Sequence, residues 1–388
     1  MPNRRLVTRR QALWLSLGTL TSIGAIATAK AGYESHQIQS LDNSKRNFKL
    51  TTYTPLKKRA SAKGIIYGAA TRRDLLESNP KLVSSFVQQC GILVPEWELK
   101  WNFLRPTPNR FDFTAGDWLA KFARTHGILF RGHTLVWHEA LPEWFEEVVN
   151  RQNAEKFLVE HITTVTKHYA GQIHSWDVVN EATKIDHKRS DGLRNSPWLE
   201  FLGPNYIELA FRIAAEQDPK AMLVYNDTEL EYDIPKHEAK RGAILKLLER
   251  LKSRGTPIHG FGIQSHLYGH ETRFNPKKLR KFLADVASLD LKILVTELDV
   301  RDQNLPKDLK TRDRIVAAAY EDYLSTVLDE KAVIAVLNWG LSDSHTWLAQ
   351  YAPRKDDAPV RPLPFDSNLK PKLAWNAIAR AFDQASKR

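Results

Sequence analysis

Two glutamates that lie far apart in the chain, Glu181 and Glu297, have surroundings that suggest catalysis. Each ends or follows a run of β-forming residues, in the segments WDVVNEA (176–182) and VTELDV (295–300). α/β barrels place their catalytic groups at the carboxyl ends of such strands. Cleavage of a glycosidic bond needs two carboxyl groups, one to protonate the leaving oxygen and one to attack or stabilise the anomeric carbon. The sequence can therefore supply the pair that this chemistry requires.

The elements that would position these glutamates follow a regular alternation. From about residue 60, short β-rich runs alternate with longer amphipathic stretches, and helices are expected at 205–217 and 237–255. Eight β-then-α units predict an α/β fold, a (β/α)8 or TIM barrel with a single catalytic domain. A doubly wound sheet is the alternative, but GIIYGAATRRD is not the Gly-rich phosphate loop that usually follows its first strand. The expected strands cover residues 64–70, 90–95, 128–134, 173–181, 221–227, 258–266, 291–299 and 332–340.

Polar and aromatic side chains gather at the carboxyl ends of these expected strands. One cluster alone could be a helix cap, but six at the same end of six strands would ring one mouth of a barrel. These clusters are His133, Asn180-Glu181, Asn226-Asp227, Gln264-His266, Glu297-Asp299 and Trp339.

The N-terminus has the composition of an export signal. Residues 1–31 hold a basic region, then an apolar stretch, then the possible A-x-A cleavage site Ala27–Ala29. The segment TRRQAL (8–13) resembles a twin-arginine motif, although Ala12 stands where an aromatic residue is usual. We therefore expect export by the twin-arginine machinery to the periplasm or the exterior. An uncleaved membrane anchor is the alternative. Residues 32–59 are expected to be a linker and residues 60–388 the catalytic barrel.

Composition argues against several other classes of protein. The chain has 388 residues and a formal charge of +12, but five of its basic residues lie within the export signal. No clustered basic face or nucleic-acid-binding motif is evident, so no nucleic-acid partner is expected. Cys90 is the only cysteine and lies in an apolar run, as a small core residue would. No Cys/His cluster has zinc spacing, so we expect no metal or cofactor, and we expect a monomer.

Several motifs together resemble glycoside hydrolase family 10, the β-1,4-xylanases. The resemblance extends from about residue 64 to residue 384, and the order and spacing of the motifs agree. It implies a retaining endo-1,4-β-xylanase acting on xylan or xylo-oligosaccharides, which the N-terminal signal would direct to the exterior. The motifs are FRGHTLVWH (130–138), WDVVNEA, GIQSHL (262–267), VTELDV, the Trp339/Trp347 pair and PLPFDSNLKPK (362–372).

The resemblance also implies a role for each candidate residue. Glu181 resembles the general acid/base, which must carry a proton near neutral pH, and Glu297 resembles the nucleophile, which must be ionised. His266 and Asp299 resemble the pair that orients the nucleophile, and Asn180 resembles the residue that bonds the 2-hydroxyl of the cleaved sugar. The resemblance further implies a cis peptide between His133 and Thr134. The expected substrate-binding residues are Glu96, Lys100, His133, Trp137, Gln264, Trp339 and Trp347.

Three positions depart from the family pattern. Trp97 replaces a sugar-binding asparagine, Ala140 replaces a glutamine, and Thr228 stands where a stacking aromatic is common. These changes leave open a related retaining β-glycanase, or a xylo-oligosaccharide hydrolase with an altered glycone subsite. A non-catalytic sugar-binding barrel is less favoured, because both glutamates and Asn180 are present.

Overall fold

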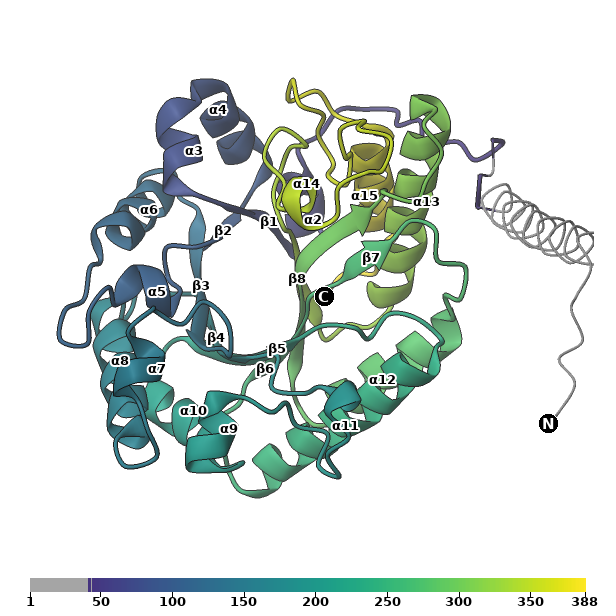
Figure 1. Ribbon diagram of the computed structural model, residues 1–388. Helices are drawn as coiled ribbons and strands as arrows, with labels where there is room; N and C mark the ends of the chain where they lie inside the picture. Colours follow the sequence, from purple (N-terminus) through teal and green to yellow (C-terminus); the bar gives the residue numbers. More distant parts are fainter. Residues whose placement is uncertain (1–40, 43) are drawn as a thin grey trace, which may run out of the picture.

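The computed structural model describes residues 41–42 and 44–388, in which parallel strands form a closed barrel surrounded by helices (Figure 1). The ring runs β1-β2-β3-β4-β5-β6-β8-β9 and closes through pairing of β9 with β1. A doubly wound sheet has two open edges, so this closure excludes it. All eight predicted strands are confirmed, as β1 Ile66–Thr71, β2 Ile92–Pro95, β3 Leu129–Val136, β4 Ser175–Asn180, β5 Met222–Asp227, β6 Gly260–Ile263, β8 Lys292–Arg301 and β9 Val333–Asn338.

The helices form the outer layer, and the two that the sequence predicted are α10 and α11 (Figure 1). Three of them begin where an Asn or Ser is followed by Pro: Asn79, Ser196 and Asn275 each accept a hydrogen bond from a backbone N–H three residues ahead. Such a cap satisfies one of the N–H groups left free at a helix start. The helices are α2 Leu56–Ser61, α3 Arg73–Ser78, α4 Pro80–Gln89, α5 Trp101–Leu104, α6 Thr114–Thr125, α7 Phe145–Val148, α8 Ala154–His168, α9 Pro197–Leu202, α10 Tyr206–Gln217, α11 Pro235–Ser253, α12 Pro276–Ala287, α13 Leu309–Val327, α14 Leu348–Tyr351 and α15 Leu373–Gln384, with a 3₁₀ turn η1 at Ile185–His187.

The core has two parts because side chains alternate between the two faces of each strand. On β2, Ile92 and Val94 pack in a small cluster with residues of β1, β5, β8 and β9, whereas Leu93 packs in the large core that the helices cover. Trp339, just after β9, belongs to the small cluster. Cys90 is fully buried in the large core, which confirms that it is a core residue. The filled interior leaves the strand ends as the place for chemistry.

A short strand that the sequence analysis did not predict, β7 His266–Tyr268, lies beside the end of β8. Its register sets His266 opposite Asp299 and Tyr268 opposite Arg301. This is possible because β8 has ten residues and extends past its pairing with β6, which ends at Ile263 and Val295. This extended part of β8, together with β7, places the pairs His266–Asp299 and Tyr268–Arg301 at the carboxyl end of the barrel.

The N-terminal predictions fall partly outside the described residues. The expected export signal at 1–31 lies wholly outside them, as does most of the first half of the expected linker. The described part of that linker packs on the barrel: Phe48 is 4% exposed, Leu56 is fully buried, and Arg46 forms an ion pair of 2.6 Å with Glu321 of α13. Arg46, Phe48 and Leu56 of the expected linker thus contact the barrel domain. Among the described helices, none combines the length and the apolarity needed to cross a membrane.

Candidate active site

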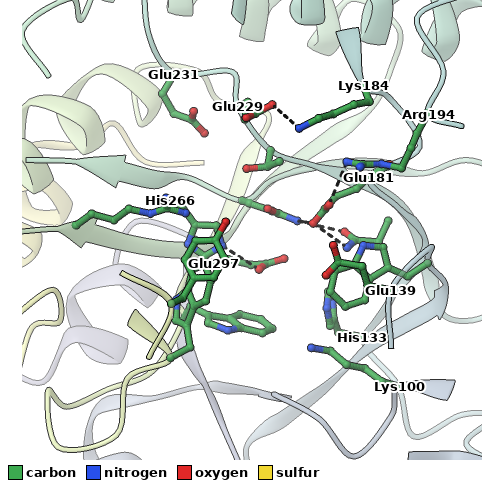
Figure 2. A pocket seen from close by; sticks show the side chains of 18 of the residues that line it. Lys100, His133, Glu139, Glu181, Lys184, Arg194, Glu229, Glu231, His266 and Glu297 are labelled. Atoms are coloured by element: carbon green, nitrogen blue, oxygen red, sulfur yellow. Dashed lines mark hydrogen bonds and ion pairs between the residues drawn. The ribbon is translucent and has the colours of Figure 1, made fainter. Parts of the chain in front are cut away.

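A pocket of about 290 Å³ opens at the carboxyl ends of the strands. All predicted site residues except Glu96 and Asp299 line it. Figure 2 shows Glu181 and Glu297 in the middle of the pocket, with Lys100 and His133 on one side and Lys184 and Arg194 on the other. The ring of strand ends predicted from the sequence thus forms one concave site.

Glu297 lies near the middle of the extended strand β8 and is 5% exposed. Its Oε1 accepts a hydrogen bond of 2.8 Å from Asn226 Nδ2, and its Oε2 lies 3.2 Å from His266 Nε2. Burial by itself would raise the pKa of Glu297, but the hydrogen bond from His266, the nearby histidine charges and the bond from Asn226 lower it below the usual value. The carboxylate is therefore held ionised, as a nucleophile must be.

His266 supplies part of the positive charge that keeps Glu297 ionised. The His266 Nδ1 atom lies 3.0 Å from Oδ1 of Asp299, a fully buried carboxylate. The other oxygen of Asp299, Oδ2, accepts a hydrogen bond of 2.8 Å from Trp347 Nε1. Burial opposes the charged imidazole, yet Asp299 and Glu297 together raise the pKa of His266 to about 10. An imidazolium at neutral pH thus links the two carboxylates, and the contacts expected of the orienting pair are present.

Glu181 is the first residue after β4, and its backbone has a φ of 54° in the left-handed region. Non-glycine residues adopt this region rarely and often at functional sites. Its carboxyl Oε1 accepts hydrogen bonds from Gln264 Nε2 at 2.9 Å and from Asn180 Nδ2 at 3.3 Å. Its Oε2 lies 3.4 Å from Arg194 Nη2, and Arg194 Nε donates to the Glu181 carbonyl at 2.7 Å. The side chain is thus fixed toward the pocket by two amides and one guanidinium.

Asn226, at the end of β5, links the two halves of the site, and the sequence analysis did not name it as a site residue. Its Nδ2 donates to Asn180 Oδ1 at 2.9 Å as well as to Glu297, and its Oδ1 accepts from Thr296 at 2.8 Å. Gly262 on β6 makes room for it, because a Cβ there would lie 2.2 Å from Asn226 Oδ1. The sequence does place Asn226 in one of the polar clusters at the strand ends. That position alone does not show whether the amide is buried and links other side chains or binds a sugar.

The wall that contains Lys100 offers polar groups that the protein does not use itself. Burial lowers the pKa of Lys100, against the charges of Glu297 and other acids, and its Nζ lies 5.0 Å from the ring centre of Trp137. The indole N–H of Trp137 is buried without a partner in the described structure. His133 Nδ1 lies 3.0 Å from Asp177, and the predicted cis peptide between His133 and Thr134 is confirmed. The Lys100 ammonium and the Trp137 indole N–H can donate to sugar hydroxyls.

Glu96 and Trp97, which follow β2, lie outside the lining of the pocket. Glu96 is absent from the pocket lining, and burial raises its pKa to about 7, against the charges of Arg72 and Lys100. Trp97 also lies outside the lining; it is 39% exposed, stacks on Phe103 at 5.9 Å and holds Arg72 over its ring at 3.9 Å. The Trp97 ring thus packs with Arg72 and Phe103, and the effect of this substitution on sugar binding stays a prediction.

The other two positions that depart from the family pattern, Thr228 and Ala140, differ in their relation to the pocket. Thr228 lines the pocket and Ala140 does not. Further lining residues were missed, among them the ion pair of Lys184 with Glu229 at 3.7 Å. Most of them follow strand ends in loops, where no periodic pattern fixes the direction of a side chain. The missed residues are Glu139, Lys184, Arg194, Glu229, Glu231, Tyr268, Arg301 and Tyr351.

The site's chemistry is carried by carboxyl, imidazole and amide groups. Within residues 41–42 and 44–388, no group of three or more His, Cys, Asp or Glu side chains is arranged to hold a metal ion.

Comparison with known proteins places these features in context. Residues 55–381 match the model of Glycosyl hydrolase family 10. The β-1,4-xylanase of Dictyoglomus thermophilum is 37% identical over 304 residues, which cover 74% of this chain and 81% of that protein. Endo-1,4-beta-xylanase B of Paenibacillus barcinonensis is 33% identical over 350 residues, which cover 85% of this chain and 100% of that protein.

Solved structures show the same fold. Native xylanase 10B from Thermotoga maritima has a TM-score of 0.78 and 32% identity, covering 85% of this chain and 98% of that chain. Xylanase 10B from Thermotoga petrophila RKU-1, solved in complex with xylobiose, has a TM-score of 0.78 and 30% identity, covering 87% of this chain and 99% of that chain.

Proposed function

The chain belongs to glycosyl hydrolase family 10, and we propose that it is an endo-1,4-β-xylanase that cleaves internal xylosidic bonds of xylan by double displacement. The observation that carries the mechanism is the setting of Glu297. This buried carboxylate has a lowered pKa, is held by His266 and Asn226, and lines the same pocket as Glu181. In this proposal Glu297 is the nucleophile and Glu181 the proton donor, and they act on the two sides of one glycosidic bond.

In the first displacement, a carboxylate oxygen of Glu297 attacks the anomeric carbon while Glu181 gives its proton to the glycosidic oxygen. The bond between that carbon and oxygen breaks, the leaving chain departs with a new hydroxyl, and a glycosyl ester forms on Glu297. Because Glu297 is already ionised and oriented by His266, it needs neither deprotonation nor reorientation before it attacks.

In the second displacement, the now ionised Glu181 takes a proton from water, and the water oxygen attacks the anomeric carbon. The ester to Glu297 breaks, which returns both carboxyls to their first state and leaves the product with its original anomeric configuration. Asn180 supports both steps in this proposal. In this role its amide bonds the 2-hydroxyl of the reacting sugar, and the support is its position next to Glu181 and its hydrogen bond from Asn226.

The proposal is tested by the stereochemistry and the size of the products. Hydrolysis of xylan followed by proton NMR should show the β-anomer first and the α-anomer only after mutarotation. Chromatography of the same samples should show long and intermediate oligomers early, because an endo enzyme cuts inside the chain. An α-anomer as first product would contradict double displacement. Activity on short xylo-oligomers with none on xylan would favour the xylo-oligosaccharide hydrolase instead.

We also propose that residues 1–31 direct export through the twin-arginine machinery. The support is the basic region with Arg9-Arg10, the apolar stretch and the A-x-A site. Replacing both Arg9 and Arg10 with Lys should keep the enzyme in the cytoplasm of a bacterial host, as measured by xylanase activity in the separated fractions. The matched control replaces Arg4 and Arg5 with Lys and should leave export unchanged.

Unchanged export of the Arg9/Arg10 variant would contradict this route. The mass of the exported protein distinguishes a cleaved signal from a retained anchor, because cleavage after Ala29 removes the whole basic and apolar stretch.

A further inference from the structure

We propose that Arg301 forms a binding position for the carboxylate of an acidic side branch, such as a uronic acid, on the polysaccharide that occupies the pocket. This inference rests on the proposed xylanase function and names a substituent of the substrate. Arg301 ends the extended strand β8 and lines the pocket.

Three aromatic rings hold the guanidinium in place. Its central carbon lies 4.9 Å from the ring centre of Tyr268, 5.5 Å from that of Trp347 and 5.2 Å from that of Tyr351. The register of β7 on β8 sets Tyr268 beside Arg301, and Tyr351 ends the short helix α14. Aromatic faces attract a guanidinium and restrict its movement, but they leave its N–H groups free to donate. The cage therefore orients the donors, and only the Tyr268 hydroxyl accepts a hydrogen bond from one of them.

The donors of Arg301 are largely unused by the protein. Over the described residues, no carboxylate lies within ion-pair distance of Arg301, whereas Lys184 and Arg194 in the same pocket both have acidic partners. Its Nε is buried without a hydrogen-bond partner, and Nη1 makes one long bond of 3.3 Å to the Tyr268 hydroxyl. An arginine has five N–H donors, and leaving buried donors unpaired costs free energy. An anionic ligand would supply the missing acceptor.

The neighbouring acids are engaged elsewhere and do not compete for this position. Asp299 contacts His266 and Trp347, and Asp302 accepts from the Arg361 backbone N–H at 3.0 Å. In the same pocket, Glu229 is paired with lysines, and burial raises the pKa of Glu231. Arg301 is thus a cation that no acidic side chain neutralises directly.

The place of Arg301 also indicates where the branch lies. Trp347 packs against His266 with ring centres 4.9 Å apart, and His266 holds Glu297. The Trp347 ring thus contacts both the Arg301 guanidinium and His266, which orients the nucleophile. Tyr351 is 65% exposed, so this side of the pocket opens to solvent, where a branch can leave the main chain. A carboxylate matches the planar donor pair of a guanidinium, which makes an acidic sugar the fitting ligand.

The test uses two branched xylo-oligosaccharides that differ in one group. One carries a glucuronic acid branch, and in the other the carboxyl is reduced to the alcohol. The wild-type enzyme should show a kcat/KM about tenfold higher on the acid, the size expected of a charge-assisted hydrogen bond. Arg301→Gln should bring the ratio of the two values close to one, and Arg301→Lys should keep part of the preference.

Arg72→Gln is the matched control, because Arg72 also lies over an exposed aromatic ring but outside the pocket. It should leave the acid-to-neutral ratio unchanged. Equal losses on both substrates in Arg301→Gln would show a packing role and overturn the proposal. The absence of any acid preference in the wild type would also overturn it, as would a failure to hydrolyse either branched oligomer. Hydrolysis of linear xylan in the same experiment shows separately whether the proposed function stands.

Discussion

Replacement of Glu297 by Ala is expected to lower kcat on xylan by about 10⁴- to 10⁶-fold, because no other group can form the covalent intermediate. Asn226 and His266 would remain in place, but both are donors and neither can attack a sugar carbon. The measurement is steady-state hydrolysis of xylan and of an aryl xylobioside. Folding of the variant is checked by its thermal unfolding and its circular dichroism.

Added azide gives this prediction a sharper form. Azide should occupy the space left by the Glu297 side chain and attack an activated aryl xylobioside, which restores turnover and yields an α-glycosyl azide. The matched control is Glu297→Gln, which is equally unable to attack but leaves no space, so azide should restore much less activity. A β-glycosyl azide from Glu297→Ala would indicate that Glu297 acts as the acid/base and would reverse the proposed roles.

The barrel could be predicted from sequence because it depends on local patterns. Each of the eight strands of the ring is a β-rich run bounded by helical stretches, and the observed strands lie within or close to the predicted ranges. The same holds for the site residues that end strands, such as Asn180 and Gln264, because parallel strands bring their carboxyl ends to one face. For residues at strand ends, the order and the direction of the strands are enough to place the side chain at the mouth of the barrel.

What could not be predicted depends on packing between distant segments. The caging of Arg301 needs β7 and α14, two elements of three and four residues that give no periodic signal. Trp97 is next to Glu96 in a family motif, yet its ring packs with Arg72 and Phe103. The direction of such a side chain is decided by competition among tertiary contacts, and sequence position does not determine that outcome.

The structure also explains why His266 is protonated, which the sequence left open. A resemblance can identify His266 as an orienting residue, but its protonation depends on distances to Asp299 and Glu297. Asp299 is fully buried, so its charge acts on His266 with little screening by water. At neutral pH a protonated His266 thus lies beside an ionised Glu297, with the buried Asp299 on the other side of the imidazole ring.

Replacement of Glu181 by Ala should separate the two steps of the reaction. On xylan the leaving group is a sugar hydroxyl, a poor leaving group, so loss of the proton donor should reduce kcat/KM by about 10²- to 10⁴-fold. On a dinitrophenyl xylobioside the leaving group needs no proton, so the first displacement should be nearly as fast as in the wild type. The second displacement would then be slow, since no base activates water, and a burst of dinitrophenol followed by slow turnover is expected.

The control for this experiment is Glu181→Gln, which keeps the contact to Gln264 and Asn180 but cannot transfer a proton. It should show the same dependence on the leaving group. Normal hydrolysis of xylan by Glu181→Gln, or equal losses on both substrates in Glu181→Ala, would assign Glu181 a packing role. Azide offers an independent check, because it should react with the glycosyl ester on Glu297 from the face that water uses and give a β-glycosyl azide. Opposite azide products from the Glu181 and Glu297 variants follow only if the two carboxyls act on opposite faces of the sugar, as double displacement requires.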